Sequence, residues 1–388
     1  MVAKPAEATT PAAPTGARHD VVALIAKPGG PDTGVGRYVQ MLHQGLCTAG
    51  INAVRIAPSV PPLPTRAYQL IKWLGADVQT FLLNYPLWAA YPPAEVYHLT
   101  SQNLASLLLF RHPPGRVVIT VHDIIPYMLR NDPQLCTYRT FADRMFDGLA
   151  MLGLRRADHL IADSHYTRHC VVKRLGIASE RVSVVHLGID HERFRPQAVP
   201  EAIYARYGLR RDRCYLIYVG SEDPRKNLVT LLQALARVRA ARYDVELIKV
   251  GRAHFAAERR KLSDLAAQLG VGHAIHWLDN VSEEDLPLLY NLADVCVMPS
   301  LYEGFGFPVL EAMACGTPVV CARAASLPEL VGGAAQLVSP HDAVGLAEAI
   351  LATLAIRHRL TLDMIEQSQR FSWQQTAADV LRIYHDLV

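Results

Sequence analysis

Residues 294–322, DVCVMPSLYEGFGFPVLEAMACGTPVVCA, combine an apolar run, a glycine-containing loop, a short helical pattern and a second apolar run. The first run ends at Ser300, and Pro308 suits the first turn of a helix that Gly316 would end. A buried strand, a helix and another buried strand in this order are typical of a parallel sheet whose two faces are covered by helices. The stretch therefore predicts an α/β fold.

The same order recurs over nearly the whole chain of 388 residues, which is long enough for two domains. Twelve short runs rich in Val, Ile and Leu predict strands at 21–26, 52–57, 96–100, 117–123, 159–164, 182–188, 214–220, 245–251, 274–280, 294–300, 317–322 and 334–340. A polar, proline-containing segment at 188–213 separates them into two sets of six. We predict two doubly wound domains, 19–195 and 196–370, with a flexible tail at 1–18 and a terminal helix at 371–388.

Composition excludes several classes of protein. Hydrophobic residues make up 51% of the chain and charged residues 19%, which indicates a folded globular protein. The net charge of +3 forms no basic block, so we expect no nucleic-acid partner. The seven cysteines include no C-x-x-C pair. The first residues contain no apolar segment of the kind found in signal peptides. The longest apolar run, LASLLLF, is too short to span a bilayer. These features favour a cytoplasmic protein with reduced thiols.

Glu303 and Glu311 are the first candidate ligand-binding residues. Ligands of doubly wound sheets bind outside the carboxyl ends of the strands, and Glu303 follows a strand directly. Glu311 falls in the first turns of the next helix, where unpaired backbone amides attract anions and a carboxylate can accept hydrogen bonds from vicinal hydroxyls. The alternative is that Glu311 only complements the helix dipole and Glu303 is a solvated loop residue.

Arg225 and Lys226 are the second candidate group. They follow Gly220, which ends the strand at 214–220, and they precede a helix in VGSEDPRKNLVTLLQA. Cations are unfavourable beside a helix N-terminus unless an anion arrives, so the pair points to a phosphate-containing ligand. The alternative is an ordinary surface pair of basic residues.

The first strand is followed by AKPGGPDTGVGRYV, in which Gly34 and Gly36 begin a dinucleotide-like pattern. Val39 stands where a third glycine is required, and no acidic residue ends the next strand to bind a ribose, so a nicotinamide enzyme is a poor fit. The loop can act as a simple glycine turn, or its backbone amides can approach a substrate closely.

The two glutamates and the segment between them, SLYEGFGFPVLEAMACGTPVV, resemble the E-x-x-x-x-x-x-x-E signature of the retaining glycosyltransferases of family 4. The resemblance is strongest over 220–340, and PRKNL is part of it. It implies the GT-B fold, in which two Rossmann-like domains, an acceptor-side N-terminal one and a nucleotide-sugar-binding C-terminal one, face each other across a cleft. It also implies that the terminal helix beginning FSW crosses back to the N-terminal domain.

The resemblance assigns roles to individual residues. Glu311 would bind the ribose hydroxyls and Glu303 the donor sugar, while Arg225 and Lys226 would neutralise the diphosphate as the glycosyl bond breaks. Ser221 stands where some relatives carry an arginine. The backbone amides that would lie near the sugar and diphosphate belong to Gly304, Phe305, Gly306 and Phe307.

Residues of the first domain are assigned by the same resemblance. His122, in VVITVHD, would reach across the cleft to the donor sugar, although a histidine bonded to strand backbone is the simpler interpretation. Asp123 and Ser164 are placed on the acceptor side, and Ser164 can equally be a helix N-cap. The loop after the first strand holds Lys27 and no histidine base, which favours retention.

The expected activity is transfer of a hexose from a nucleotide diphosphate sugar, first of all mannose from GDP-mannose, to a saccharide or lipid-linked saccharide with formation of an α-linkage. No D-x-D motif or zinc-like cluster of ligands occurs, so we expect no cofactor and no metal. A UDP-sugar donor remains an alternative, as do a nucleotide-sugar epimerase or phosphorylase of the same fold and a non-enzymatic binding module.

A lipid-linked acceptor would bring the protein to the inner face of a membrane. Four arginines are scattered through an otherwise apolar helical stretch and could face anionic lipid there: Arg139, Arg144, Arg155 and Arg156. The sequence leaves the oligomeric state, the acceptor and the pathway open.

Overall fold

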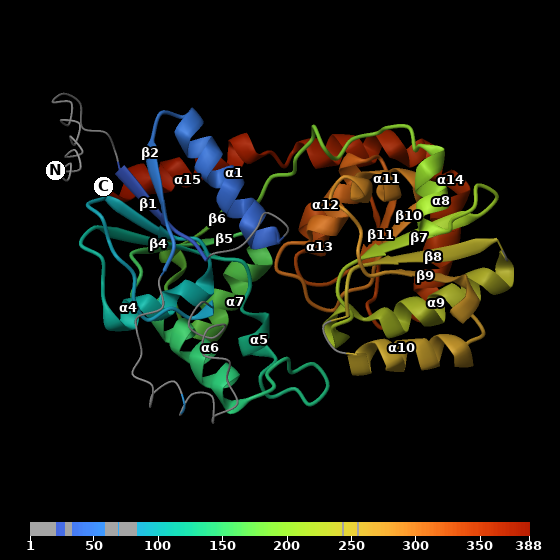
Figure 1. Cartoon of the computed structure of the whole chain (residues 1–388), viewed down its shortest axis with the longest axis horizontal. Helices are drawn as coiled ribbons and strands as arrows, with labels where there is room; N and C mark the ends of the chain where they lie inside the picture. Colours follow the sequence, from blue (N-terminus) through green and yellow to red (C-terminus); the bar gives the residue numbers. More distant parts are fainter. Residues whose placement is uncertain (1–20, 28–32, 59–68, 70–83, 243, 254–255) are drawn as a thin grey trace, which may run out of the picture.

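The computed structural model describes residues 21–27, 33–58, 69, 84–242, 244–253 and 256–388, and shows two α/β lobes side by side (Figure 1). The predicted tail at 1–18 lies outside the described residues. Each lobe is built on one six-stranded sheet in which every recorded pair of neighbouring strands is parallel. The prediction of two doubly wound domains is confirmed.

The first sheet has the strand order β2-β1-β3-β4-β5-β6. Its strands are β1 (Val21–Ile25), β2 (Asn52–Ile56), β3 (Val96–Leu99), β4 (Arg116–Val121), β5 (His159–Ala162) and β6 (Val182–Val184). The helices of this lobe are α1 (Gly34–Thr48), α4 (Leu107–Phe110), α5 (Ile125–Met128), α6 (Phe141–Leu154) and α7 (His165–Leu175). Segment 185–200 leads from β6 to the second lobe.

The second sheet has the strand order β12-β11-β10-β7-β8-β9. Its strands are β7 (Cys214–Val219), β8 (Val245–Val250), β9 (Ile275–Leu278), β10 (Val295–Met298), β11 (Val319–Ala322) and β12 (Gln336–Val338). Its helices are α8 (Glu201–Tyr207), α9 (Leu228–Ala241), α10 (Ala256–Gln268), α11 (Asp285–Leu292), α12 (Phe307–Ala314), α13 (Leu327–Val331) and α14 (Ala343–Gln369). All twelve predicted strands are present.

The apolar runs form central strands because their side chains are buried on both faces of the sheets. Every residue of β3, β10 and β11 is buried, whereas β2 lies at an edge and is largely exposed. The chain leaves β7 in one direction along the sheet toward β9, and β10 lies on the other side of β7. Such a reversal of strand order opens a crevice at the carboxyl ends of β7 and β10, which is where ligands of these folds bind.

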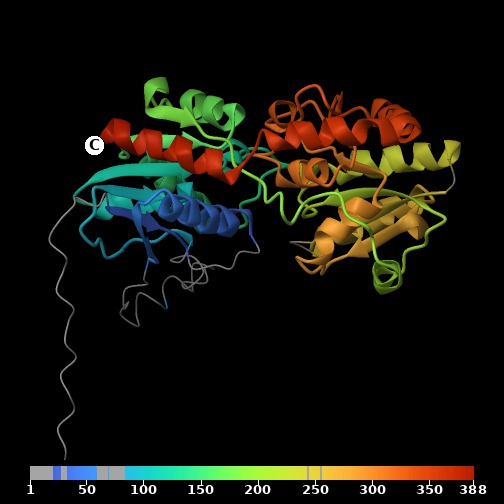
Figure 2. The same cartoon turned by 90° about the horizontal axis from the view of Figure 1, so that it is seen from above.

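The terminal helix α15 (Trp373–Leu387) crosses back to the first lobe, as expected, and packs beside α1 (Figures 1 and 2). Two glycines permit the contact: a Cβ on Gly188 would lie 2.2 Å from the Trp373 nitrogen, and one on Gly45 would lie 2.6 Å from the Cβ of Ala377. Larger residues at either position would force the helix away. In the described part of the chain no helix has the length and apolarity needed to cross a membrane.

A buried hydrogen-bond network fixes α15 to the first sheet. His98 is fully buried on β3 and bonds through Nδ1 to the Tyr384 hydroxyl, 2.6 Å away, and through Nε2 to the Thr120 hydroxyl, 2.7 Å away. Thr120 also shares a hydrogen bond with Tyr38 of α1. Burial, with a smaller contribution from the charge of His122, lowers the pKa of His98 to about 3.

This lowered pKa predicts a loss of stability in mild acid. Below its ordinary pKa of 6.5, His98 binds a proton in the unfolded chain but not in the folded one, so the free energy of unfolding falls as the pH drops toward 3. Between pH 7.5 and 5 the loss from this residue is about 2 kcal/mol. Urea unfolding of the wild type and His98→Gln at both pH values checks this, because the variant should depend less on pH. An equal change in the free energy of unfolding between the two pH values in both proteins would contradict this role of His98.

Candidate functional site

Lys226 and Glu303 meet at the crevice between β7 and β10. Lys226 Nζ donates hydrogen bonds of 2.6 and 2.8 Å to the two carboxylate oxygens of Glu303, and the Ser300 hydroxyl donates a third of 2.8 Å. Glu303 is only 6% exposed. Burial raises the pKa of Glu303, but the charges of Lys226 and Arg225 outweigh it and the net shift is downward. The interpretation of Glu303 as a solvated loop residue is wrong.

Arg225 completes this cluster. Its Nη1 lies 3.8 Å from Glu303 Oε2 and donates a hydrogen bond of 3.0 Å to the Tyr302 carbonyl, while the Leu301 amide donates one of 2.8 Å to the Arg225 carbonyl. Two adjacent cations thus lie in a largely buried place with the carboxylates of Glu303 and Asp223, the latter 3.8 Å from Arg225 Nε, and burial lowers the pKa of Lys226. The interpretation of Arg225 and Lys226 as an ordinary surface pair is also wrong. The two adjacent cations could attract a phosphate group.

Local sequence explains how the two loops are held together. The Asp223 side chain accepts a hydrogen bond from the Arg225 amide and starts the short 3-10 helix Pro224–Lys226. Asn227 ends it with a φ of 59°, a left-handed conformation that Asn tolerates. Its side-chain amide donates to the carbonyls of Pro299 and Pro340, at 3.0 and 2.6 Å, which ties the β7 loop to the loops after β10 and β12.

Glu311 lies in α12 and contacts both domains. It is 3% exposed and accepts hydrogen bonds from the Tyr290 hydroxyl, at 2.9 Å, and from Arg37 Nη1, at 2.6 Å. Arg37 belongs to α1 of the first domain, and its guanidinium lies over the rings of Phe194 and Phe307, at 5.8 and 5.6 Å. Glu311 is therefore a buried acceptor that already holds a cation from the opposite domain.

The loop between the two glutamates is seated against the first domain. A Cβ on Gly304 would lie 2.2 Å from the His122 carbonyl oxygen, so only glycine fits there. Gly306 adopts a φ of 117° at the N-terminus of α12, a conformation that also requires glycine. Phe305 is buried beside them, and the Phe307 ring lies 3.4 Å from the Cβ position of Gly34.

His122 is held by protein groups at both ring nitrogens. Nε2 lies 3.0 Å from the Thr100 carbonyl and Nδ1 lies 3.3 Å from Asp163 Oδ2. Because a carbonyl only accepts, Nε2 carries a proton, and the second contact needs another proton on Nδ1 or on the carboxyl. Burial raises the pKa of Asp163 to about 6. The geometry shows the structural role of His122, and its contact with a donor sugar stays a prediction.

Ser164 combines two roles. Its hydroxyl accepts the Thr167 amide as the N-cap of α7, which confirms the N-cap interpretation, and it donates a 2.6 Å hydrogen bond to the Gly304 carbonyl across the domain boundary. Asp123 accepts from the Ile125 amide at 3.0 Å. The acceptor-side roles of both residues stay predictions.

The remaining glycines border the same region. Gly36 donates its amide to the Thr33 hydroxyl, which caps α1, and Gly220 turns the chain after β7 with a φ of 154°. Lys27, after β1, bonds to Asn84, and burial lowers its pKa to about 8.

Sequence reasoning missed several residues of this site. Arg37 directly follows the Gly34-x-Gly36 pattern, and Asp163 ends a buried strand, so both carried a positional signal. Tyr290 carried none, because it lies within a helix far from any strand end. Its contact with Glu311 depends on how α11 and α12 pack together.

These features define the GT-B fold. The chain forms two parallel doubly wound sheets, the carboxyl ends of β4 and β5 meet the loop after β10, and a terminal helix returns to the first domain. Sucrose-phosphate synthase from Thermosynechococcus elongatus has this fold with a TM-score of 0.72 and 24% identity, over 95% of this chain and 99% of that one. The model of Glycosyltransferase Family 4 matches residues 33–193, and that of Glycosyl transferases group 1 matches 201–371. The chain belongs to glycosyltransferase family 4.

Two curated relatives are similar over much of the sequence. O-antigen chain mannosyltransferase B of Escherichia coli is 30% identical over 279 residues, which is 70% of this chain and 71% of that protein. MMP alpha-(1->4)-mannosyltransferase of Mycolicibacterium hassiacum is 35% identical over 243 residues, which is 60% of this chain and 55% of that protein. The match thus spans little more than half the length of the second relative.

Proposed function

We propose that this protein is a retaining hexosyltransferase that moves a sugar from a nucleotide diphosphate donor to a saccharide or lipid-linked saccharide. The observation that carries the proposal is the cluster of Arg225, Lys226 and Glu303 at the crevice between β7 and β10, with buried Glu311 in the helix that follows the Glu303 loop. It brings two cations and two carboxylates to the place where this fold binds ligands. A diphosphate and a polyhydroxylated sugar need these two kinds of group.

Each group has a role in breaking the bond between sugar and phosphate. Negative charge develops on the leaving diphosphate, and the fixed charges of Lys226 and Arg225 stabilise it in a largely buried site. Glu303 accepts hydrogen bonds from the sugar hydroxyls and Glu311 from the ribose. The amides of the loop from Gly304 to Phe307 complete the donor site, with Gly34 and Gly36 approaching from the other domain. The two cations provide the stabilisation without a metal.

For the donor we propose GDP-mannose, with transfer to an α-linkage. Two relatives named as mannosyltransferases support mannose. A UDP-sugar is the second candidate, since every residue of the cluster would serve it equally well.

A panel of nucleotides separates these donors. Because a ligand that binds only the folded protein raises its melting temperature, GDP is expected to give a shift that UDP, ADP and dTDP do not. At a GDP concentration of 100 times its Kd, the folded protein is stabilised by about 2.7 kcal/mol. A shift with UDP alone would redirect the proposal to a UDP-sugar donor. No shift with any nucleotide at millimolar concentration would contradict the donor site itself.

The outer face of α6 supports a lipid-linked acceptor. Phe141 is 79% exposed and Leu152 54%, and they share this exposed face with Met145 and with Arg144, Arg155 and Arg156, while Arg139 precedes the helix. Arg155 and Arg156 also donate to backbone carbonyls, which holds their side chains near the helix end. Exposed apolar residues interspersed with arginines match the surface of an anionic membrane.

Sedimentation with vesicles tests this face. The protein is expected to pellet with vesicles rich in anionic lipid and not with neutral ones, and salt should release it. The double variant Phe141→Ser, Leu152→Ser should bind several-fold less. Leu362→Ser, which alters a residue 76% exposed on α14 of the other domain, serves as the control. Equal pelleting of both variants would contradict the assignment of this face.

A further inference from the structure

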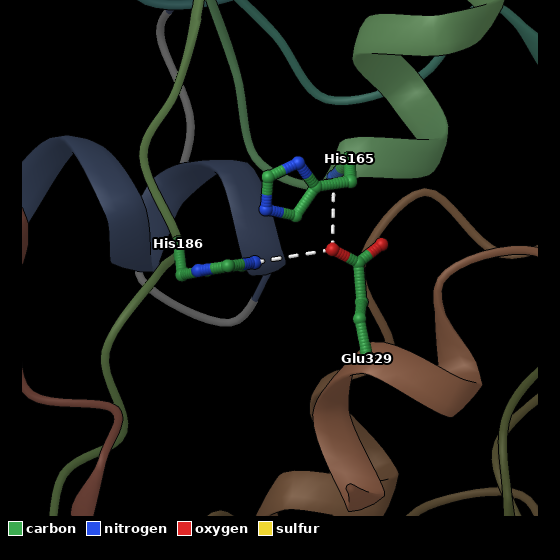
Figure 3. Close-up of side chains that lie close together, drawn as sticks. All are labelled: His165, His186 and Glu329. Atoms are coloured by element: carbon green, nitrogen blue, oxygen red, sulfur yellow. Dashed lines mark hydrogen bonds and ion pairs between the residues drawn. The ribbon is translucent and has the colours of Figure 1, made fainter.

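His165, His186 and Glu329 form a cluster at the boundary between the two domains (Figure 3), and none of them belongs to the cluster of Arg225, Lys226 and Glu303. His165 is the first residue of α7, His186 lies just beyond β6, and Glu329 belongs to α13 of the second domain. Each offers one ligand atom, and these atoms all lie within 4.8 Å of one another. It is the one group of three or more such side chains with this geometry in the part of the chain that the structure describes.

The distances already approach those of a coordinated ion. His186 Nε2 lies 3.1 Å from Glu329 Oε2. Two ligands of a tetrahedral zinc ion lie roughly 3.3 Å apart, given metal–ligand distances of about 2.0 to 2.1 Å. His165 is exposed, and its ring lies 5.6 Å from that of His186, centre to centre. Its ligand atom lies within 4.8 Å of the other two, so a rotation of this exposed side chain would bring three ligands toward one ion.

The surroundings orient the ligands. The Glu329 carboxylate accepts hydrogen bonds from the backbone amides of His165, at 2.8 Å, and Tyr166, at 3.3 Å, so its position is fixed independently of the imidazoles. The His186 ring packs edge-on against Phe371, 5.7 Å away. Hydrogen bonds and packing of this kind support the ligands of natural metal sites.

Charge and solvent access also suit a cation. Among the described residues no Lys or Arg forms an ion pair with Glu329, whose carboxylate is held by His186 and the two amides. The side chains of His186 and Glu329 are 35% and 18% exposed, so water can fill a fourth position.

We propose that His165, His186 and Glu329 bind a divalent transition-metal ion, zinc or an ion of similar ligand preference, in a site that joins the two domains. Two imidazoles and one carboxylate with an open position match the preferences of Zn²⁺, whereas Mg²⁺ and Ca²⁺ prefer oxygen ligands. Because the ligands come from both domains, the bound ion holds the domains together. Binding of the ion can be tested without the donor or the transfer reaction.

Metal binding is measured directly on the full chain. Protein without a histidine tag is stripped with chelator and titrated with ZnCl₂ by calorimetry, and with Co²⁺ while its visible absorption is followed. We expect one ion per chain and the intense absorption of four- or five-coordinate Co²⁺. We expect zinc affinity to fall by roughly 100-fold or more in each of the variants His165→Ala, His186→Asn and Glu329→Gln. Loss of a residue that only supports a ligand already lowers metal affinity about 10- to 100-fold.

A matched control lies one turn further along α7. His169 is exposed like His165 and is not a member of the cluster, so His169→Ala should keep full affinity. His165→Ala retains its backbone amide, and with it the hydrogen bond to Glu329, so this variant preserves the domain contact. Absence of stoichiometric binding would overturn the proposal. So would loss of binding in His169→Ala with full binding in Glu329→Gln, because the ion would then belong to α7 alone.

Discussion

Lys226→Ala is expected to lower kcat/KM for glycosyl transfer on the order of 10²- to 10³-fold, the effect of removing one preorganised charge-stabilising group. Lys226 contacts both oxygens of Glu303 and lies beside Arg225, at the position proposed for the leaving diphosphate. The loss should appear mainly in kcat, because the charge on the diphosphate grows as the bond breaks. Steady-state kinetics with the donor identified by the nucleotide panel measures it.

Stability must be measured alongside the rate, since Lys226→Ala leaves the buried Glu303 carboxylate with only Ser300 and the more distant Arg225. The double variant Lys226→Met, Glu303→Gln removes both charges, so it separates an effect on folding from an effect on transfer. Lys261→Ala is the control, because that residue lies on the exposed side of α10 and pairs with Glu258. Full activity in a folded Lys226→Ala protein would contradict the proposed function.

Glu311→Gln is expected to weaken nucleotide binding by roughly 10- to 100-fold, because hydrogen bonds to a charged acceptor contribute about 1.5 to 3 kcal/mol. The amide keeps the size of the side chain but replaces one acceptor oxygen by a donor. Binding of GDP, measured by calorimetry, is the direct test. A GDP analogue that lacks the ribose hydroxyls should bind the wild type more weakly than GDP does, but should bind the variant about as well as GDP, which distinguishes a ribose contact from a general disturbance.

Arg37→Met is expected to have the opposite effect on nucleotide binding. Arg37 occupies an oxygen of Glu311 at 2.6 Å in this structure, so we expect it to compete with the nucleotide for this carboxylate. Methionine keeps the packing against Phe307 and Phe194 but frees the carboxylate, and GDP should then bind about tenfold more tightly, equivalent to 1.4 kcal/mol. Weaker binding in Arg37→Met would show instead that the guanidinium contacts the ligand.

Much of this description followed from local sequence. The twelve strands were predicted because a strand buried on both faces needs a nearly continuous apolar run, and the site loops because polar residues follow those runs directly. Lys226 and Glu303 were placed at the same edge of one sheet for this reason, and they do form an ion pair. Pro308 and Gly316 likewise fixed the ends of α12 to within two residues.

Contacts between the domains could not be predicted in this way. Arg37 and Glu311 are 274 positions apart, and Ser164 and Gly304 are 140 positions apart. His122 carried a motif, yet its partners Thr100 and Asp163 come from the ends of two neighbouring strands. Glu329 carried no signal, and its contact with α7 exists only because α13 meets the other domain.

Local sequence was enough to predict the two sheets, the boundary region between them and the strand ends that carry chemistry, because hydrophobic periodicity and turn residues act over a few neighbouring positions. Only the packed structure shows that Glu311 holds Arg37, that His122 is bound on both sides, and that two histidines meet Glu329. These pairings depend on how two separately folded domains and a crossing helix pack together, which no local pattern of residues specifies.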